Sequence, residues 1–256
     1  GGTDSSTIVA LMQEQSPKPV RTFTVGFREA AYNEAEGARK VALHLGTKHT
    51  EIMVSPQDCL KVIPKLPEIY SEPFADSSQI PTFLISQLAR QHVTVALSGD
   101  GGDELFGGYN RHRLAHRAWS GLRVVPRPLR AGIARGLRSM PPQAWDGLLS
   151  HWEAPERLVS GIGQHDGFFA KKFAETAGIR PVERMMATDS ATYLPDDILT
   201  KVDRASMAVS LEVRTPFLDH RVVEFAWRLP QSWKVRTDAT KIILRRILEG
   251  YVPRAL

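Results

Sequence analysis

Hydrophobic residues recur along the first 110 positions in two alternating patterns, one at helical spacing and one in short β-rich runs. The predicted elements are, in order, a helix over residues 5–15, a strand over 21–27, a helix over 33–45, a strand over 49–54, a helix over 56–70, a helix over 80–91 and a strand over 93–97. Ser55 followed by Pro56 is typical of a helix start, and Gly46 of a helix end. This alternation predicts an α/β architecture with a parallel sheet and helices on both of its faces.

From Tyr109 onward the pattern changes, because Arg, Pro and Trp dominate as far as Trp152 and the strand signal disappears. Further along, the periodicity predicts helices over residues 195–207, 220–229 and 238–249, the last ended by Gly250. We therefore predict one domain in three parts. These are an α/β nucleotide-binding part at 1–110, a variable basic helical insertion at 111–190 and a mostly helical part at 191–256.

Composition narrows the class of protein. With 256 residues, 42% of them hydrophobic, the chain can bury a sizeable core without disulfides or metals. Its one cysteine, Cys59, cannot form an internal disulfide, which excludes a disulfide-framed secreted module. No apolar run approaches the length of a membrane span, and the N-terminus lacks signal-peptide features, so a cytoplasmic location is the expectation. Because the chain begins at Gly1 rather than Met, we read it as a piece of a longer polypeptide.

The net charge of +5 bears on possible partners. Much of the basic excess lies in one stretch, residues 111–138. A basic region can attract nucleic acid or an anionic ligand, but a modest excess of arginine is more often solvated surface. Nucleic acid is therefore not the favoured partner, and whether the protein forms a homodimer stays open.

The first six residues, GGTDSS, combine two glycines, an acid and two hydroxyls immediately before a predicted helix. The backbone of Gly1 and Gly2 can approach an anion closely, Ser5 and Ser6 add donors, and the helix N-terminus adds a positive dipole end. Asp4 suits such a site if it holds Mg²⁺, which takes one or two carboxylates together with phosphate oxygens. An ordinary helix cap is the alternative interpretation, and the lysine of a Walker loop is missing.

A second motif, LSGDGGDELFGGY at residues 97–109, follows a predicted strand. It places five glycines and three acids within 13 residues, a composition that no hydrophobic core requires. Such a loop can approach a nucleotide closely, and its acids can share a cation with Asp4. A glycine-rich turn or a calcium loop is the alternative, although the EF-hand spacing is not met.

Together these motifs carry a resemblance to a known family. The segments GGTDSS at 1–6, FTVGF at 23–27, LSGDGGDELFGGY at 97–109, DILTKVDRASMAVSLEVRTPFLDH at 197–220 and KIILR at 241–245 resemble the synthetase domain of glutamine-dependent asparagine synthetases, in the order of that family. They span nearly the whole chain, while residues 110–190 contribute little. The resemblance implies a parallel-sheet ATP-pyrophosphatase fold, similar to the adenine nucleotide alpha hydrolases, with a mostly helical C-terminal half.

The resemblance also implies a reaction in two steps. The carboxylate of an acceptor such as aspartate attacks the α-phosphate of ATP, giving an acyl-adenylate and pyrophosphate, and ammonia from a separate glutaminase domain then gives the amide and AMP. The residues that the resemblance assigns to ATP and Mg²⁺ are Gly1, Gly2, Asp4, Ser5, Ser6, Val25, Ser98, Gly99 and Asp103, with Asp4 and Asp103 as the metal ligands.

Four further residues are catalytic candidates. Lys241 matches the lysine that the family places against the phosphates, where a fixed cation would stabilise developing charge. Glu212 and Arg214 could orient or clamp the acceptor carboxylate, or could equally form a structural ion pair. Asp100 stands where some members of the family have Glu, and this shorter acid could alter how ammonia or its protons are handled.

The acceptor itself stays open. Where some aspartate-using enzymes present an arginine near the intermediate, this chain has Ser77. Asparagine synthesis is the main hypothesis, and amidation of another carboxylate, such as a sugar acid in polysaccharide synthesis, is the alternative within the enzymes. A nucleotide-binding module without turnover is the alternative from another class.

Overall fold

The computed structural model describes residues 2–27, 35–138, 168–176 and 178–256. Its strands are β1 (Arg21–Phe27), β2 (Lys48–Val54), β3 (Val95–Leu97) and β4 (Glu212–Arg214). Its α-helices are α1 (Thr3–Glu14), α2 (Ala35–Leu45), α3 (Pro56–Val62), α4 (Leu66–Tyr70), α5 (Gln79–Arg90), α6 (Gly102–Phe106), α7 (Asn110–Val124), α8 (Arg127–Arg138), α10 (Phe168–Glu175), α11 (Pro181–Ala191), α12 (Thr200–Met207), α13 (His220–Arg228) and α14 (Ile242–Glu249). Within the described ranges, no helix is both long and apolar enough to cross a membrane.

The strands form two parallel pairs. β1 pairs with β2 in a register that joins Arg21 to Lys48 and Phe27 to Val54. β3 pairs with β4, which joins Val95 to Glu212. The predicted α/β fold with parallel strands is observed, but the described strands form two separate pairs where one parallel sheet was predicted. The prediction that strands end before residue 110 was wrong. The three-residue strand β4 is too short to produce an alternating pattern, and it forms because β3 offers it a ladder partner.

Several local predictions are confirmed. β1 covers the predicted residues, and α5 lies within one residue of its predicted bounds. The Ser55 side chain accepts a hydrogen bond from the Asp58 backbone N–H, and the Asp58 carboxylate accepts one from the Ser55 backbone N–H. Together these two bonds make a capping box at the start of α3. The helix predicted over 56–70 is interrupted by a 3₁₀ turn at Ile63–Lys65, because Pro64 has no backbone N–H to donate. The cap predicted at Asn33 lies outside the described residues.

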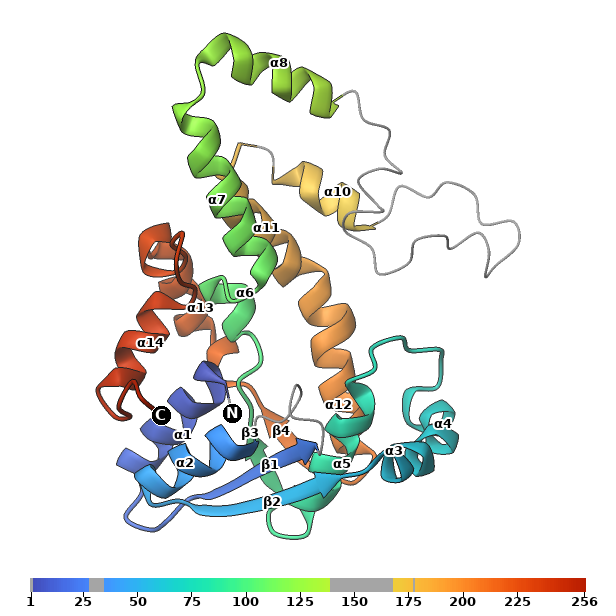
Figure 1. The fold of residues 1–256 in the computed structure, drawn as a ribbon. Helices are drawn as coiled ribbons and strands as arrows, with labels where there is room; N and C mark the ends of the chain where they lie inside the picture. The colour runs from blue at the N-terminus through green and yellow to red at the C-terminus, as the bar shows by residue number, and fades with distance from the viewer. Residues whose placement is uncertain (1, 28–34, 139–167, 177) are drawn as a thin grey trace.

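The described elements are arranged in two regions. The strand pairs lie with α1, α2 and α5 in the lower part of the view, and α7 and α11 rise side by side away from them (Figure 1). The C-terminal helix α14 packs against the N-terminal helix α1. The two ends of the chain therefore meet.

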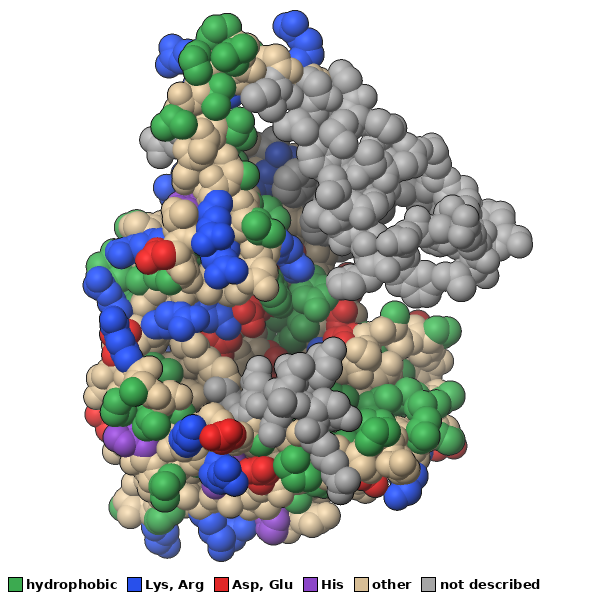
Figure 2. Space-filling view, in the orientation of Figure 1, with side chains coloured by type: hydrophobic (Ala, Val, Ile, Leu, Met, Phe, Trp, Pro, Cys, Tyr) green, Lys and Arg blue, Asp and Glu red, His purple; other side chains and the backbone are tan. Residues whose placement is uncertain are grey.

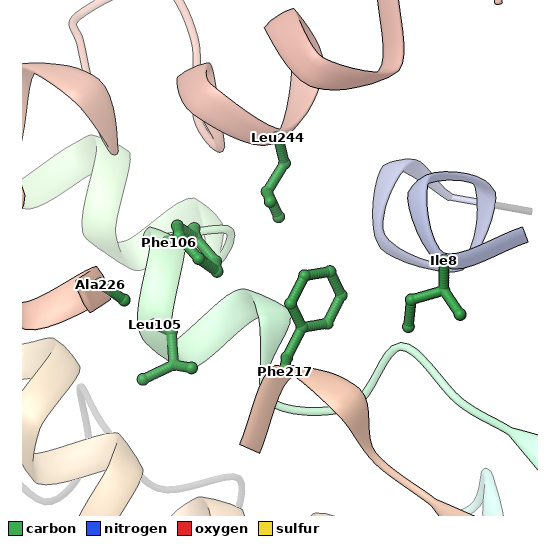
Figure 3. Close-up of a cluster of buried hydrophobic side chains, with 6 residues drawn as sticks. All are labelled: Ile8, Leu105, Phe106, Phe217, Ala226 and Leu244. Atoms are coloured by element: carbon green, nitrogen blue, oxygen red, sulfur yellow. The ribbon is translucent and has the colours of Figure 1, made fainter. Parts of the chain in front are cut away.

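A hydrophobic cluster joins these two ends. Figure 3 shows its buried members, which are Ile8, Leu105, Phe106, Phe217, Ala226 and Leu244. Ile8 belongs to α1, Leu105 and Phe106 to α6, and Leu244 to α14. Ile8 lies four residues after Asp4, and Leu244 three residues after Lys241, so the burial of one apolar cluster brings polar groups from three helices together.

A second cluster holds α12 in place. Its buried members are Val54, Val62, Phe83, Leu84 and Ala205, and they come from β2, α3, α5 and α12. α12 carries Lys201 one helical turn before Ala205. Because Ala205 is fully buried, the position of Lys201 follows from core packing.

Candidate active site

A cavity of about 950 Å³ is lined by residues of β1, β3 and β4 and by one face each of α1, α5 and α12. Its polar lining includes Gly2, Ser5 and Ser98 beside several charged side chains. In Figure 2, acidic side chains lie in the hollow at the centre of this face, with basic side chains beside them. The cavity is of the size that binds small organic ligands.

Lys241 lies between two carboxylates at one end of this cavity. Its Nζ atom donates a hydrogen bond to Asp4 and forms an ion pair with Asp103 Oδ1 at 2.7 Å. Asp4 comes from the first turn of α1, Asp103 from the first turn of α6, and Lys241 from the residue before α14. We call these three residues the charged cluster.

The charged cluster is partly buried, and burial shifts its titration. Burial alone would lower the pKa of Lys241, but the carboxylates of Asp4 and Asp103 outweigh it and raise that pKa, so the side chain is an ammonium. Burial raises the pKa of the Asp4 carboxyl, and Lys241 opposes this shift. Asp4 Oδ1 is buried without a hydrogen-bond partner, a costly arrangement for a carboxylate oxygen.

Two glycines give the charged cluster its room. A Cβ atom on Gly102 would lie 2.6 Å from Asp4 Cγ. A Cβ atom on Gly108 would lie 1.8 Å from Asp103 Oδ1 and 2.1 Å from Lys241 Cε. Residues with a side chain at these positions would displace the charges, which explains in physical terms why this segment is so rich in glycine.

The backbone of Lys241 is also unusual. Its φ of 53° and ψ of 38° lie in the left-handed region, which is unfavourable by about 1 kcal/mol or more for a residue other than glycine. The surrounding contacts therefore hold Lys241 in a conformation that the isolated residue would avoid. Such local strain is characteristic of sites where function fixes a side chain.

A second group of acids continues along the cavity. Ser98 Oγ donates to Asp100 Oδ2 at 2.7 Å, and burial raises the pKa of the Asp100 carboxyl. Glu104 is 1% exposed and lines the same cavity, and burial likewise raises its pKa. The Tyr109 hydroxyl donates a hydrogen bond to Glu104. Neither Glu104 nor Tyr109 was named as a site residue from the sequence, although both belong to the motif at 97–109.

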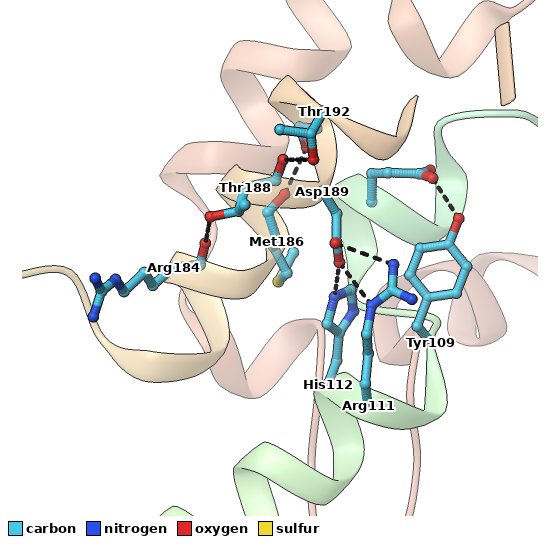
Figure 4. A network of polar contacts seen from close by, with 10 residues as sticks. Tyr109, Arg111, His112, Arg184, Met186, Thr188, Asp189 and Thr192 are labelled. Atoms are coloured by element: carbon cyan, nitrogen blue, oxygen red, sulfur yellow. Dashed lines mark hydrogen bonds and ion pairs between the residues drawn. The ribbon is translucent and has the colours of Figure 1, made fainter. Parts of the chain in front are cut away.

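Figure 4 shows the polar contacts around Tyr109. The Arg111 guanidinium lies 4.3 Å from the centre of the Tyr109 ring and pairs with Asp189 at 3.0 Å. Nε2 of His112, which is fully buried, lies 2.7 Å from the other oxygen of Asp189. These contacts tie α7 to α11 behind the cavity. No pattern in the sequence pairs residues so far apart.

A second lysine, which is not part of the charged cluster, also lines the cavity. Lys201 Nζ forms an ion pair with Asp76 Oδ2 at 2.6 Å, and the two side chains are only 10% and 17% exposed. Burial alone would raise the pKa of Asp76, but hydrogen bonds from Lys201 and Ser78 lower it to about 2. Neither Lys201 nor Asp76 was predicted from the sequence to have a role in the site.

The structure brings most of the sequence-predicted residues into one place. Those that line the cavity are Gly2, Asp4, Ser5, Ser98, Gly99, Asp100, Asp103 and Lys241. Ser6 instead lies with Thr3 on the opposite side of α1, in a second depression beside α14, and Val25 packs against the cluster that contains Val54. Gly1 lies outside the described residues.

Glu212 and Arg214 also lie off the cavity. Their strand neighbours Leu211 and Val213 line it, so strand alternation turns Glu212 and Arg214 to the other side. There they form an ion pair with each other at 2.7 Å, with 54% and 65% of their side chains exposed. Of the two roles considered for this pair, the geometry agrees with the structural one.

Metal ligands can be assessed from the donor atoms. Within the described part of the chain, no group of three or more His, Cys, Asp and Glu side chains is placed to hold a metal ion. Mg²⁺ needs only one or two carboxylates when phosphate and water complete its shell, and Asp4 and Asp103 meet that requirement. Such an ion would also give Asp4 Oδ1 the partner that it lacks.

Comparisons with known proteins identify the family of the chain. The family model described as asparagine synthase matches residues 1–256. A Mycobacterium bovis protein, named for the glutamine-hydrolysing asparagine synthetases, is 36% identical over 99% of this chain and 42% of its own length. Asparagine synthetase [glutamine-hydrolyzing] 1 of Bacillus subtilis is 33% identical over 99% of this chain and 43% of its own length. The asparagine synthetase [glutamine-hydrolyzing] of Bos taurus is 26% identical over 97% of this chain and 35% of its own length.

Proposed function

The chain belongs to the asparagine synthase family, and from this membership and the cavity we propose that it catalyses ATP-dependent amide formation. It spans less than half the length of the relatives it matches, so the activity is proposed for the protein that contains it. The proposed acceptor is aspartate and the product asparagine, with ammonia from glutamine. The proposed fold is that of the ATP pyrophosphatases, with residues 1–110, 111–190 and 191–256 as parts of one domain.

One observation carries this proposal. The charged cluster places an ammonium and two carboxylates at the N-terminus of α1, in a cavity large enough for a nucleotide. A helix N-terminus with free backbone N–H groups favours phosphate. A cation and two metal-binding acids beside it are what a departing pyrophosphate needs for charge neutralisation.

In the first step, an acceptor carboxylate oxygen attacks the α-phosphorus of ATP and the bond to the bridging oxygen breaks, so that pyrophosphate leaves with the electron pair. Gly2 and Ser5 would bind the phosphates, and Asp4 and Asp103 would hold Mg²⁺, which when bound supplies further positive charge. Lys241 would bind the phosphates from its place beside these two carboxylates. Held by the left-handed backbone, its ammonium stabilises negative charge as it develops.

In the second step, ammonia attacks the acyl carbon of the adenylate, and AMP leaves. The attacking nitrogen must lose a proton. Asp100 lines the cavity, and burial raises its pKa toward the range useful for a general base. Glu212 and Arg214 take no part in this proposal, because they face away from the cavity.

The proposal is tested by acceptor-dependent pyrophosphate release in the intact protein. With ATP, Mg²⁺ and ammonium, L-aspartate is expected to support release, and Asp4→Asn and Asp103→Asn are each expected to abolish it without unfolding the protein. Release with a sugar acid but not with L-aspartate would change the acceptor. ATP binding with no release for any carboxylate would show a binding module without turnover.

A further inference from the structure

The carboxylates that line the cavity would repel an acceptor that carries negative charge. What we infer from this repulsion rests on the proposed function. Among the described residues, four carboxylates line it: Asp4, Asp100, Asp103 and Glu104. The attacking group in the proposed reaction is itself a carboxylate. Like charges at short range repel strongly in a partly buried site, so the acceptor needs a cation on its path.

Lys241 is poorly placed to be that cation. It already contacts Asp4 and Asp103, and in the proposed reaction it serves the phosphates. Lys201 also lines the cavity, but it comes from α12 and its partner is Asp76. It is close enough to Asp100 to lower the pKa of that carboxyl by its charge, although burial has the larger, opposite effect. Lys201 and Asp100 thus line one cavity, and their charges interact across it.

The surroundings of Lys201 hold it in one orientation. Asp76, which does not line the cavity, contacts the ammonium at 2.6 Å. Its other oxygen accepts hydrogen bonds from the Ser78 backbone at 2.8 Å and the Ser78 hydroxyl at 2.7 Å. The Tyr70 hydroxyl donates to the Lys201 backbone carbonyl at 3.3 Å. Short hydrogen bonds thus fix the Asp76 carboxylate, and the Tyr70 hydroxyl holds the backbone of Lys201.

An ammonium has three donors, and the contact with Asp76 uses one of them. The cavity side of Lys201 can therefore bind a second anion while Asp76 keeps the side chain in place. We propose that Lys201, positioned by Asp76, binds a carboxylate of the acceptor beside Asp100. The substrate class this implies is a small anionic acceptor, held between Lys201 and the phosphates.

A purely structural pair is the competing interpretation, in which Lys201 and Asp76 only fasten the segment before α5 to α12. The two interpretations differ in which substrate is affected. A binding role predicts a change in acceptor affinity with little change in ATP affinity. A fastening role predicts a loss of stability that affects both substrates alike.

The test uses Lys201→Met, Lys201→Arg and Asp76→Asn in the intact protein. Because Lys201→Met leaves Asp76 without its partner in a site that is mostly buried, the double variant Lys201→Met/Asp76→Asn is made as well. Lys40→Met is the matched control, since Lys40 forms an ion pair with Glu36 on an exposed helix face. Thermal unfolding identifies the variants that are folded.

Two readouts keep this inference separate from the proposed function. The first is the KM for L-aspartate and for ATP in pyrophosphate release, and the second is calorimetric binding of L-aspartate in the presence of α,β-methylene ATP. Lys201→Met and the double variant are expected to raise the KM for L-aspartate and to weaken L-aspartate binding, each about 10- to 100-fold. This is the scale of one charge-assisted hydrogen bond. ATP affinity should change by less than about threefold, and Lys201→Arg should recover part of the loss. Asp76→Asn keeps the ammonium but loses its orientation, so a smaller rise in the L-aspartate KM is expected.

The outcomes distinguish a failure of the proposed function from a failure of the inference about Lys201. If wild type binds L-aspartate but releases no pyrophosphate, the proposed function fails while the binding comparison still decides the role of Lys201. The inference about Lys201 is overturned if the folded double variant binds L-aspartate as wild type does, if L-aspartate and ATP are weakened equally, or if wild type binds no L-aspartate at all.

Discussion

Gly108→Ala is the sharpest perturbation that the charged cluster offers. The new Cβ atom would lie 1.8 Å from Asp103 Oδ1 and 2.1 Å from Lys241 Cε. Ordinary contacts between such atoms are about 3.5 Å, so each group must move by about 1.5 Å. Both are near the ends of flexible side chains, and Gly108 does not have a positive φ. The chain can therefore accommodate the methyl group by displacing the ion pair.

The size of the effect follows from that displacement. Misplacing a catalytic group by about 1 Å can lower a rate about 100-fold, and losing one electrostatic stabiliser costs about 100- to 1,000-fold. We expect kcat for pyrophosphate release to fall at least about 100-fold, which corresponds to about 2.7 kcal/mol in the barrier. The free energy of unfolding should fall by no more than about 2 kcal/mol, because no buried apolar contact is lost.

The assay compares Gly108→Ala with a glycine that has room. Gly37 lies within α2, and no atom comes within 4 Å of the position its Cβ would take. Gly37→Ala is expected to stabilise the fold by about 0.5–1 kcal/mol and to leave turnover unchanged. A folded Gly108→Ala protein with kcat within threefold of wild type would refute the argument that the site needs Lys241 and Asp103 where they are.

Three further predictions concern single groups. Lys241→Ala should lower kcat about 100- to 1,000-fold in steady-state assays with a smaller change in ATP affinity, and Lys241→Arg should restore only part of it; normal turnover in the alanine variant would remove Lys241 from the mechanism. The pKa of Asp76 is lowered from 3.8 to about 2, so its ionised form stabilises the fold above about pH 4, and this contribution is lost as the pH falls through 2. After allowance for solvent screening this contribution amounts to about 1 kcal/mol. In urea unfolding between pH 6 and pH 2, Asp76→Asn should therefore lose less stability than wild type as the pH falls. Parallel plots of unfolding free energy against pH for the two proteins would contradict this. Ser55→Ala removes the side-chain half of the capping box and should lower the free energy of unfolding by about 1 kcal/mol in urea; a change below about 0.2 kcal/mol would show that the cap contributes nothing.

Several features of this protein are determined by short stretches of sequence alone. The strand at Arg21–Phe27, the capping box at Ser55 and the helix at Gln79–Arg90 could be predicted because apolar periodicity and caps act over a few neighbouring residues. Five short segments, at 1–6, 23–27, 97–109, 197–220 and 241–245, were sufficient for the family resemblance, which the match to the asparagine synthase model confirms. The glycine-rich motifs at 1–6 and 97–109 also supplied the four carboxylates that line the cavity among the described residues, since close approach to an anion and its cation demands glycine and polar residues at fixed spacing.

Only the tertiary structure decided how these pieces combine. The strand Glu212–Arg214 exists because β3 pairs with it, and that pairing turns Glu212 and Arg214 away from the cavity where the motif alone left their role open. Lys241 and Asp4 are 237 residues apart, and Lys201 and Asp76 are 125 apart, so no local pattern can pair them. They meet because two apolar clusters fix α14 against α1 and α12 against α5. Hydrophobic burial is non-directional and acts across the whole chain, so it determines which distant charges face one another, and this can be known only once the core is assembled.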